Sequence, residues 1–170
     1  MSTLRRFVSA LSLSVILAVT AENTTYVVNP DIRYQTIDGF GASDAWSMRF
    51  VGTMPHAVQS EVADLLFSSE TDRDGNPKGI GLSIWRFNIG AGSVEQGDSS
   101  RINNDTRTEC FLNADGGYDW NRQPGQRSFL KLAKERGVPA FLGFLNSPPV
   151  WFTENGLATN TGRGGDYNLK

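Results

Sequence analysis

The hydrophobic positions along the chain follow two periods in turn. Residues 80–89 and 138–145 carry apolar side chains on both alternating faces, a pattern that indicates strands covered on both sides. Residues 55–68 and 125–136 carry apolar side chains at the spacing of an amphipathic helix. With an extended stretch at residues 33–37, the order is strand, helix, strand, helix, strand. This order predicts an α/β fold built on a parallel sheet.

Local signals predict where the two helices begin and end. Thr53 can cap the first helix, with Pro55 in its first turn. The second helix is expected to stop at Gly137, because glycine readily adopts the left-handed conformation that ends helices. The side chains expected on the apolar sides of these helices are Val58, Val62, Leu65, Leu66, Phe129, Leu132, Ala133 and Arg136.

The part of the chain before the first helix is expected to be extended. Residues 24–29 form a short β-rich run that ends at Pro30, and residues 33–37 form a second extended stretch. Gly39 and Gly41 follow, and paired glycines let a backbone turn sharply or approach another segment closely.

Polar side chains stand at the ends of the predicted strands. Arg86 and Asn88 continue one face of residues 80–89, and Asn146 continues a face of the next strand. In (β/α)8 barrels and doubly wound sheets, the carboxyl ends of parallel strands carry the functional groups. Arg86 has two open interpretations, a structural ion pair and a functional contact with a carboxylate. The nearby strands offer no carboxylate on a matching face, so we expect the acidic partner from a later strand.

Composition narrows the classes of ligand. The sequence has 18 glycines and four tryptophans, and its aromatic residues often fall in segments rich in Gly, Asn and Asp. Aromatic rings in such loops are either local core or a platform for flat apolar faces, which sugar rings have. The polar segment 90–123 carries Phe111, Tyr118 and Trp120, and long loops in compact domains are usually functional. A net charge of −2 without a basic run argues against a nucleic-acid partner.

The first 21 residues have the features of a secretory signal peptide. Arg5 and Arg6 precede an apolar run at residues 7–19, and small side chains close to Ala21 suit a cleavage site. The run is well short of the ~20 residues that span a bilayer, and no other segment could cross one. We therefore expect a signal peptide at residues 1–21 and a secreted protein without a membrane partner.

Three motifs resemble those of glycoside hydrolase family 30. Residues 34–46 (YQTIDGFGASDAW) are similar to the family's first barrel strand, residues 84–90 (IWRFNIG) to its second, and residues 146–156 (NSPPVWFTENG) to its third strand and following loop. Within the family, the endo-β-1,6-galactanase-like group is the most similar. The motifs occur in the family's order and span most of the chain after residue 21, so together they are fairly specific, although each alone is weak.

The resemblance implies a fold and a reaction. Residues 37–170 would form about three βα units of a (β/α)8 TIM barrel, and residues 22–36 would be a β-segment of a side domain. In a retaining β-glycosidase, one glutamate protonates the leaving oxygen and a second attacks the anomeric carbon. The family's Asn-Glu-Pro segment is absent here, so both glutamates are expected beyond Lys170 and this chain is expected to be inactive. A polysaccharide is the implied partner; no cofactor and no protein partner are implied.

The resemblance also assigns roles to single residues. Arg86 matches the arginine that holds the nucleophilic carboxylate. Trp46 and Trp151 would line sugar subsites, Asn146 would hydrogen-bond a sugar hydroxyl near the cleavage point, and Asp44 would orient the first loop or bind substrate. The full set of residues expected to bind substrate is Asp44, Trp46, Asn88, Asn146 and Trp151.

Other candidate residues point to less specific roles. Glu95 and Glu154 lie outside the family's catalytic positions, and Glu95 is expected to have no partner in its polar loop. The turn that begins at Asp72 resembles the start of a calcium loop, but Ser83 stands where the closing glutamate belongs, so we expect a plain turn without a metal. Cys110, the only cysteine, is expected to be an inert thiol.

Several alternative functions stay open. The same machinery could act on xylan or on a β-glucoside, as glucosylceramidases do, with segment 90–123 selecting the sugar. A non-catalytic carbohydrate-binding module fits the loop tryptophans, but such modules are usually all-β. A nucleotide-binding domain lacks support, because Gly90 and Gly92 are not followed by the third glycine of that fingerprint. We also expect the chain alone to aggregate or to stay partly unfolded, since three barrel strands leave an open edge and bare apolar faces.

Overall fold

The computed structural model describes residues 25–159 and 169. By its contacts the chain divides into two units, residues 1–36 and 37–170. The predicted signal peptide lies outside the described residues. Within the described residues, no helix is long and apolar enough to cross a membrane.

The first unit has no regular secondary structure over residues 25–36. A turn brings the Ile32 amide to 3.3 Å from the Asn29 carbonyl, and the Asn29 side chain accepts from the Asp31 amide at 3.0 Å. The first strand predicted at residues 33–37 is wrong, because no neighbouring strand supplies ladder hydrogen bonds there. The chain first joins the sheet a few residues later, in the second unit.

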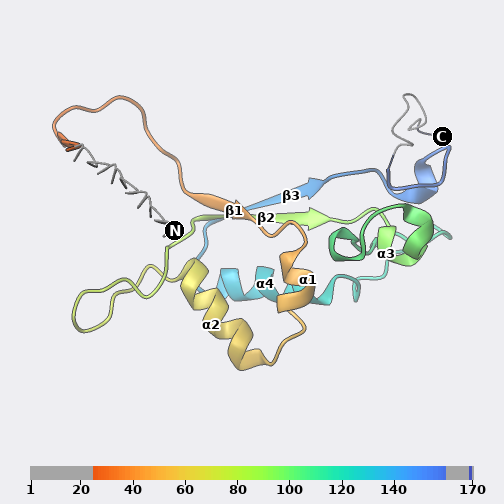
Figure 1. Cartoon of the computed structure of the whole chain (residues 1–170), viewed down its shortest axis with the longest axis horizontal. Helices are drawn as coiled ribbons and strands as arrows, with labels where there is room; N and C mark the ends of the chain where they lie inside the picture. The colour runs from red at the N-terminus through yellow and green to blue at the C-terminus, as the bar shows by residue number, and fades with distance from the viewer. Residues whose placement is uncertain (1–24, 160–168, 170) are drawn as a thin grey trace, which may run out of the picture. The chain divides into compact units, whose positions relative to one another are not determined.

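The second unit is built on a parallel three-stranded sheet, as the sequence predicts (Figure 1). The strands, in sheet order, are β1 (Gly41–Ser43), β2 (Ile84–Ile89) and β3 (Ala140–Leu145). Their register sets Ser43 beside Arg86 and Arg86 beside Leu142. Residues in register on parallel strands point to the same face. Because all three strands run the same way, their carboxyl ends meet at one edge of the sheet.

Glycine lets β1 approach β2 closely, as the paired glycines predict. A Cβ atom on Gly41 would lie 2.8 Å from the Cβ of Ile84, and one on Gly39 would lie 2.5 Å from the Ser83 hydroxyl oxygen. Real Cβ atoms do not come that near, so larger residues at either position would push the strand away.

The strand β2 begins later than the hydrophobic pattern predicts. The Ile80 amide donates to the Leu65 carbonyl at 2.8 Å, and the Leu82 amide donates to the Leu66 carbonyl at 2.9 Å. These residues therefore pair with the end of the preceding helix before the chain enters the sheet.

The two predicted helices are confirmed as α2 (His56–Phe67) and α4 (Pro124–Glu135), and both lie on one side of the sheet (Figure 1). Gly137, with a φ of 79°, follows α4 where the sequence predicts its end. The shorter elements of the second unit are α1 (Ser47–Val51), α3 (Ser93–Gln96) and the 3-10 turns η1 (Gly97–Ser100), η2 (Asn104–Thr106) and η3 (Val150–Phe152).

The predicted cap of α2 is wrong. Pro55 occupies the cap position, where no side chain bonds the first-turn amides. The Thr53 hydroxyl instead donates to the Phe50 carbonyl at 2.7 Å, within the turn that follows α1.

The buried face of α2 is also rotated from the predicted stripe. Leu65 is 62% exposed, whereas Gln59 is buried. Gln59 tolerates burial because its amide group donates to the Met54 carbonyl at 2.7 Å and accepts from the Ser128 hydroxyl at 2.6 Å. A count of apolar positions cannot find a glutamine whose polar atoms are satisfied inside the fold.

The core lies between the sheet and the two long helices. Phe67 of α2 meets Trp85 of β2 edge to face, with ring centroids 5.0 Å apart and an interplanar angle of 86°. Phe129 and Ala133 of α4 are completely buried beside them. This packing fixes β2 on the helices and thereby positions the residues at its end.

The other face of the sheet is largely uncovered by described residues. Leu142 of β3, in register with Arg86, is 53% exposed on this face. Phe141 and Leu145 are in register with Trp85 and Ile89, so they lie on the helix-facing side, and they are exposed as well. The prediction that the apolar strands are covered on both sides is therefore wrong for β3 in this structure.

Candidate functional site at the carboxyl ends of the strands

Two adjoining cavities lie at the carboxyl edge of the sheet. The larger has a volume of about 440 Å³ and the smaller of about 100 Å³. Trp46, Asn88 and Asn146 line both cavities, and Arg86 lines the smaller one. These are four of the six residues that the sequence singles out, and they come from three segments that are far apart along the chain.

The turn after β1 places Trp46 at the cavities. Ala45 precedes it with a φ of 45°, a left-handed conformation that costs a residue with a Cβ atom about 1 kcal/mol or more. The turn is held from both sides: the Asn88 side-chain amide donates to the Ala45 carbonyl at 3.3 Å, and the Ala45 amide donates to the Ser43 hydroxyl at 3.2 Å. The indole therefore stands on a backbone fixed by β2.

Asp44 is a buried carboxyl group just behind the cavities. Its side chain is 1% exposed, and neither carboxylate oxygen has a hydrogen-bond partner among the described residues. Burial raises the pKa of Asp44 to about 7, while the nearby Asn88 backbone amide lowers it in part without reaching hydrogen-bond geometry. Asp44 lines neither cavity, so this structure does not bring it together with the other predicted substrate-binding residues.

Arg86 points from the middle of β2 towards the smaller cavity. Its guanidinium carbon lies 3.5 Å from the centroid of the Phe144 ring, which is a cation–π contact. No carboxylate among the described residues forms an ion pair with it. The structural ion pair is thus not formed among the described residues, and Arg86 lines the smaller cavity without an acidic partner there.

The loops after β2 and β3 build the walls of the larger cavity together. The Val150 amide donates to the Ala91 carbonyl at 3.0 Å, and the Gln96 side chain donates to the Gly156 carbonyl. Ala91, Val150 and Ala158 form a small buried apolar cluster between the loops. Each loop therefore depends on the other for its position.

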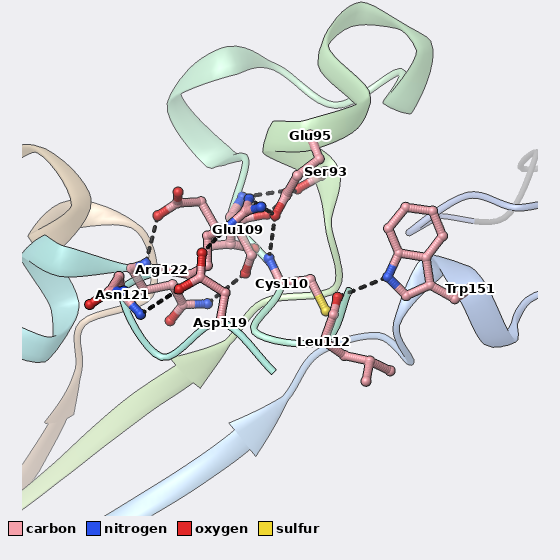
Figure 2. A network of polar contacts seen from close by, with 11 residues as sticks. Ser93, Glu95, Glu109, Cys110, Leu112, Asp119, Asn121, Arg122 and Trp151 are labelled. Atoms are coloured by element: carbon pink, nitrogen blue, oxygen red, sulfur yellow. Dashed lines mark hydrogen bonds and ion pairs between the residues drawn. The ribbon is translucent and has the colours of Figure 1, made fainter. Parts of the chain in front are cut away.

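Trp151 follows Val150 in the loop after β3 and lines neither cavity. Its indole N–H donates to the Leu112 carbonyl at 2.9 Å, as Figure 2 shows, and 37% of the residue is exposed. The structure therefore ties Trp151 to the loop after β2 and keeps it apart from Trp46.

The structure adds residues that the sequence analysis missed. Phe144 supports Arg86, and a period-two reading of β3 could have found it, because Phe144 shares the face of Asn146. Ile102 and Thr108 line the larger cavity from segment 90–123, where no periodic pattern marks them.

Glu95 and the turn at Asp72 have internal partners. The prediction that Glu95 has no partner is wrong, because its carboxylate accepts a hydrogen bond from Arg122 at 2.6 Å. The Asp72 side chain accepts from the amides of Asp74 and Asn76 at 2.9 and 2.8 Å, which makes a plain turn. Among the described residues, no group of three His, Cys, Asp or Glu side chains could hold a metal ion.

Comparison with known proteins decides the family. The model of O-glycosyl hydrolase family 30 matches residues 23–170. The chain belongs to this family.

Relatives of known name agree with this membership. The chain is 26% identical over 176 residues to an endo-beta-1,6-galactanase of Hypocrea rufa, covering 95% of this chain and 35% of the relative. A conserved exported protein of Bacteroides fragilis is 46% identical, with a TM-score of 0.73, over 79% of this chain and 28% of that protein. The catalytic domain of GH30 xylanase C from Talaromyces cellulolyticus is 29% identical, with a TM-score of 0.51, over 78% and 28%. The chain thus spans about a third of the length of its family 30 relatives.

Proposed function

We propose that this chain is the N-terminal part of a secreted, retaining family 30 glycosidase that cleaves β-1,6-galactan within a (β/α)8 barrel. Three consecutive parallel strands with helices on one side are the arrangement from which such a barrel grows. The observation that carries the proposal is Arg86. It faces a cavity shared with Trp46, Asn88 and Asn146 and has no acidic partner among the described residues.

Arg86 would hold the nucleophilic glutamate of the reaction. In retaining glycosidases the nucleophile and the acid/base carboxyl group lie ~5–5.5 Å apart, and the nucleophile must be ionised to attack the anomeric carbon. A guanidinium next to it stabilises the charged form and fixes the carboxylate by paired hydrogen bonds. Phe144, stacked on Arg86, would keep the guanidinium plane in place. Both glutamates would come from sequence after Lys170.

The remaining cavity residues would bind the sugar. Trp46 offers a flat apolar ring to one sugar face, and Asn88 and Asn146 offer amide groups to hydroxyls. Trp151 would contact a sugar farther from the cleavage point. Asp44 would support the first loop from behind.

The proposal is tested in the protein expressed from the longest reading frame that contains this chain, called the extended protein below. We expect it to release oligosaccharides from β-1,6-galactan with retained anomeric configuration. Arg86→Lys keeps the charge but loses the paired donors, so kcat/KM is expected to fall about a hundredfold or more. Arg73→Lys, in the exposed turn after α2, is the matched control and should leave activity unchanged. An Arg86→Lys protein with wild-type activity would refute the role of Arg86.

Secretion is tested separately. If residues 1–21 are a signal peptide, the protein exported by a secretion host should begin at Glu22, which N-terminal sequencing reads directly. An exported protein that still begins at Met1, or retention of the protein in the cell, would contradict this part of the proposal.

A second substrate has specific support. The xylanase C catalytic domain matches this chain at a TM-score of 0.51, so xylan is the competing polymer. Measuring reducing sugars released from β-1,6-galactan and from xylan under the same conditions decides between them. A non-catalytic carbohydrate-binding protein would bind a polymer and release nothing.

A further inference from the structure

One carboxylate oxygen holds the loop after β2 together. Oε1 of Glu95, in α3, accepts from the Cys110 amide at 3.0 Å and from Nη1 of Arg122 at 2.6 Å (Figure 2). The Glu95 and Arg122 side chains are only 21% and 30% exposed. Charge-assisted hydrogen bonds in partly buried surroundings are stronger than those of exposed ion pairs.

The two residues that bond Glu95 stand on either side of a small hairpin, residues 111–119. In this hairpin the Asp119 amide donates to the Phe111 carbonyl and the Asn113 amide donates to the Gly117 carbonyl, both at 2.8 Å. Cys110 comes immediately before the hairpin. Arg122 comes after it and also bonds the Asp119 carboxylate at 3.2 Å. Glu95 therefore fixes both ends of the hairpin at once.

The hairpin in turn holds Trp151. Leu112 forms an antiparallel bridge with Tyr118 inside the hairpin, and its carbonyl accepts the Trp151 indole N–H at 2.9 Å. Two hydrogen bonds, joined by the backbone from Cys110 to Leu112, thus link the Glu95 carboxylate to the indole. No other hydrogen bond of the indole N–H occurs among the described residues.

We propose that Glu95 is a positioning residue for Trp151. Its negative charge orients the hairpin 111–119, and the hairpin carbonyl orients the indole ring that meets the sugar. The sugar contact rests on the proposed function, whereas the link between Glu95 and the indole does not.

The test compares Glu95→Gln with Asp98→Asn in the extended protein. Both changes remove one negative charge from the segment after β2, but the Asp98 carboxylate pairs with Arg107 at 2.7 Å in a fully exposed position. Hydrogen exchange of the Trp151 indole N–H, followed by NMR with isotope-labelled tryptophan and assigned with Trp151→Phe, is the structural readout. In Glu95→Gln we expect exchange about tenfold faster, and in Asp98→Asn no change.

Kinetics supply the functional readout. Glu95→Gln is expected to raise KM for a β-1,6-linked galactotetraose several-fold with kcat almost unchanged, as Trp151→Ala should, because the ring binds the sugar away from the bond that breaks. If Glu95→Gln does not fold, Arg122→Gln replaces it. This variant removes the link to Arg122 and keeps the Cys110 bond, and a smaller acceleration of exchange is expected.

The outcomes separate the two proposals. Indole exchange in Glu95→Gln, or in its replacement, equal to that in Asp98→Asn would overturn the positioning role, whatever the enzyme does. Faster exchange in a protein that neither binds nor cleaves galactan would support the positioning role and refute the proposed substrate.

Discussion

Asp44, just after β1, and Arg86, in the middle of β2, are ionisable side chains, and neither forms an ion pair with a described residue. Moving such groups partly or wholly out of water lowers the free energy of unfolding, unless another interaction compensates for the lost hydration. Arg86 is compensated in part by the Phe144 ring. Asp44 is compensated by holding its proton, which has a measurable consequence.

The stability of the protein should depend on pH through Asp44. Its pKa is about 7 in the folded protein and about 3.8 when unfolded, so the folded state holds the proton more tightly. The contribution of Asp44 to the free energy of unfolding is therefore highest below pH ~4, falls as pH rises from ~4 to ~7 and levels off above that. We expect a loss of up to roughly 4 kcal/mol in the free energy of unfolding over this range, measured by urea denaturation of the extended protein.

Asp44→Asn is the control, because an amide stays neutral at every pH. The free energy of unfolding of the wild type should therefore fall relative to that of this variant as pH rises from about 4 to about 7. A difference that stays constant over the whole range would show that Asp44 is ionised in the folded state.

The sequence places some of these residues well and others poorly. The alternation of side chains along the strands predicts that Arg86, Asn88 and Asn146 lie close together, and the structure places all three around the smaller cavity. This alternation cannot predict where the Trp46 side chain lies, because the left-handed conformation of Ala45 interrupts it. The resemblance to family 30 singles out Trp46, but only tertiary contacts show that Asp44 is buried.

At the scale of elements, the helices are easier to predict than the strands. The apolar period finds α2 and α4 to within two residues at their ends. The start of β2 is missed because residues 80–82 pair with the end of α2, a contact between segments that no local pattern encodes. Likewise, the Thr53 side chain could cap a helix, but its hydroxyl donates to the Phe50 carbonyl in the turn after α1 instead.

The contact between α1 and α4 depends on glycine. A Cβ atom on Gly52 would overlap the Cα of Gly125, and one on Gly125 would overlap the Met48 carbonyl. Gly52→Ala is therefore expected to force the helices apart and to lower the free energy of unfolding by about 1–3 kcal/mol. Thermal or urea denaturation of the extended protein measures the loss.

Gly143→Ala provides the comparison for this substitution. Among the described residues, a Cβ atom at Gly143 would meet only the Ile89 side chain, at 3.4 Å, which is an ordinary contact. It should change stability much less. Equal effects of the two substitutions would mean that the glycine contact between α1 and α4 does not matter.

For the whole molecule, the uncovered face of the sheet is the dominant feature. Leu142 is largely exposed, and the outer edge of β3 has no strand beside it among the described residues. Exposed apolar strands with free edges recruit other chains. A barrel would cover this face with its own later strands.

The chain of 170 residues expressed alone is therefore expected to aggregate and to release no sugar from galactan. Size-exclusion chromatography should show high-molecular-mass material, and calorimetry should show no cooperative melting transition. The extended protein, under the same conditions, should elute as a defined species and melt cooperatively. A monomeric, cooperatively melting 170-residue chain would contradict the prediction.

The two loops that meet above the sheet are joined largely through main-chain acceptors. The carbonyls of Ala91, Leu112 and Gly156 receive the bonds from Val150, Trp151 and Gln96. Because a carbonyl is the same in every amino acid, these hydrogen bonds do not themselves require particular side chains at the acceptor positions. What restricts these positions is packing at Ala91 and Leu112, which are buried, and the left-handed backbone at Gly156, whose φ is 65°. A mutational library at residues such as Ile102 and Thr108 could thus alter which sugar fits while the frame around the cavity stays intact.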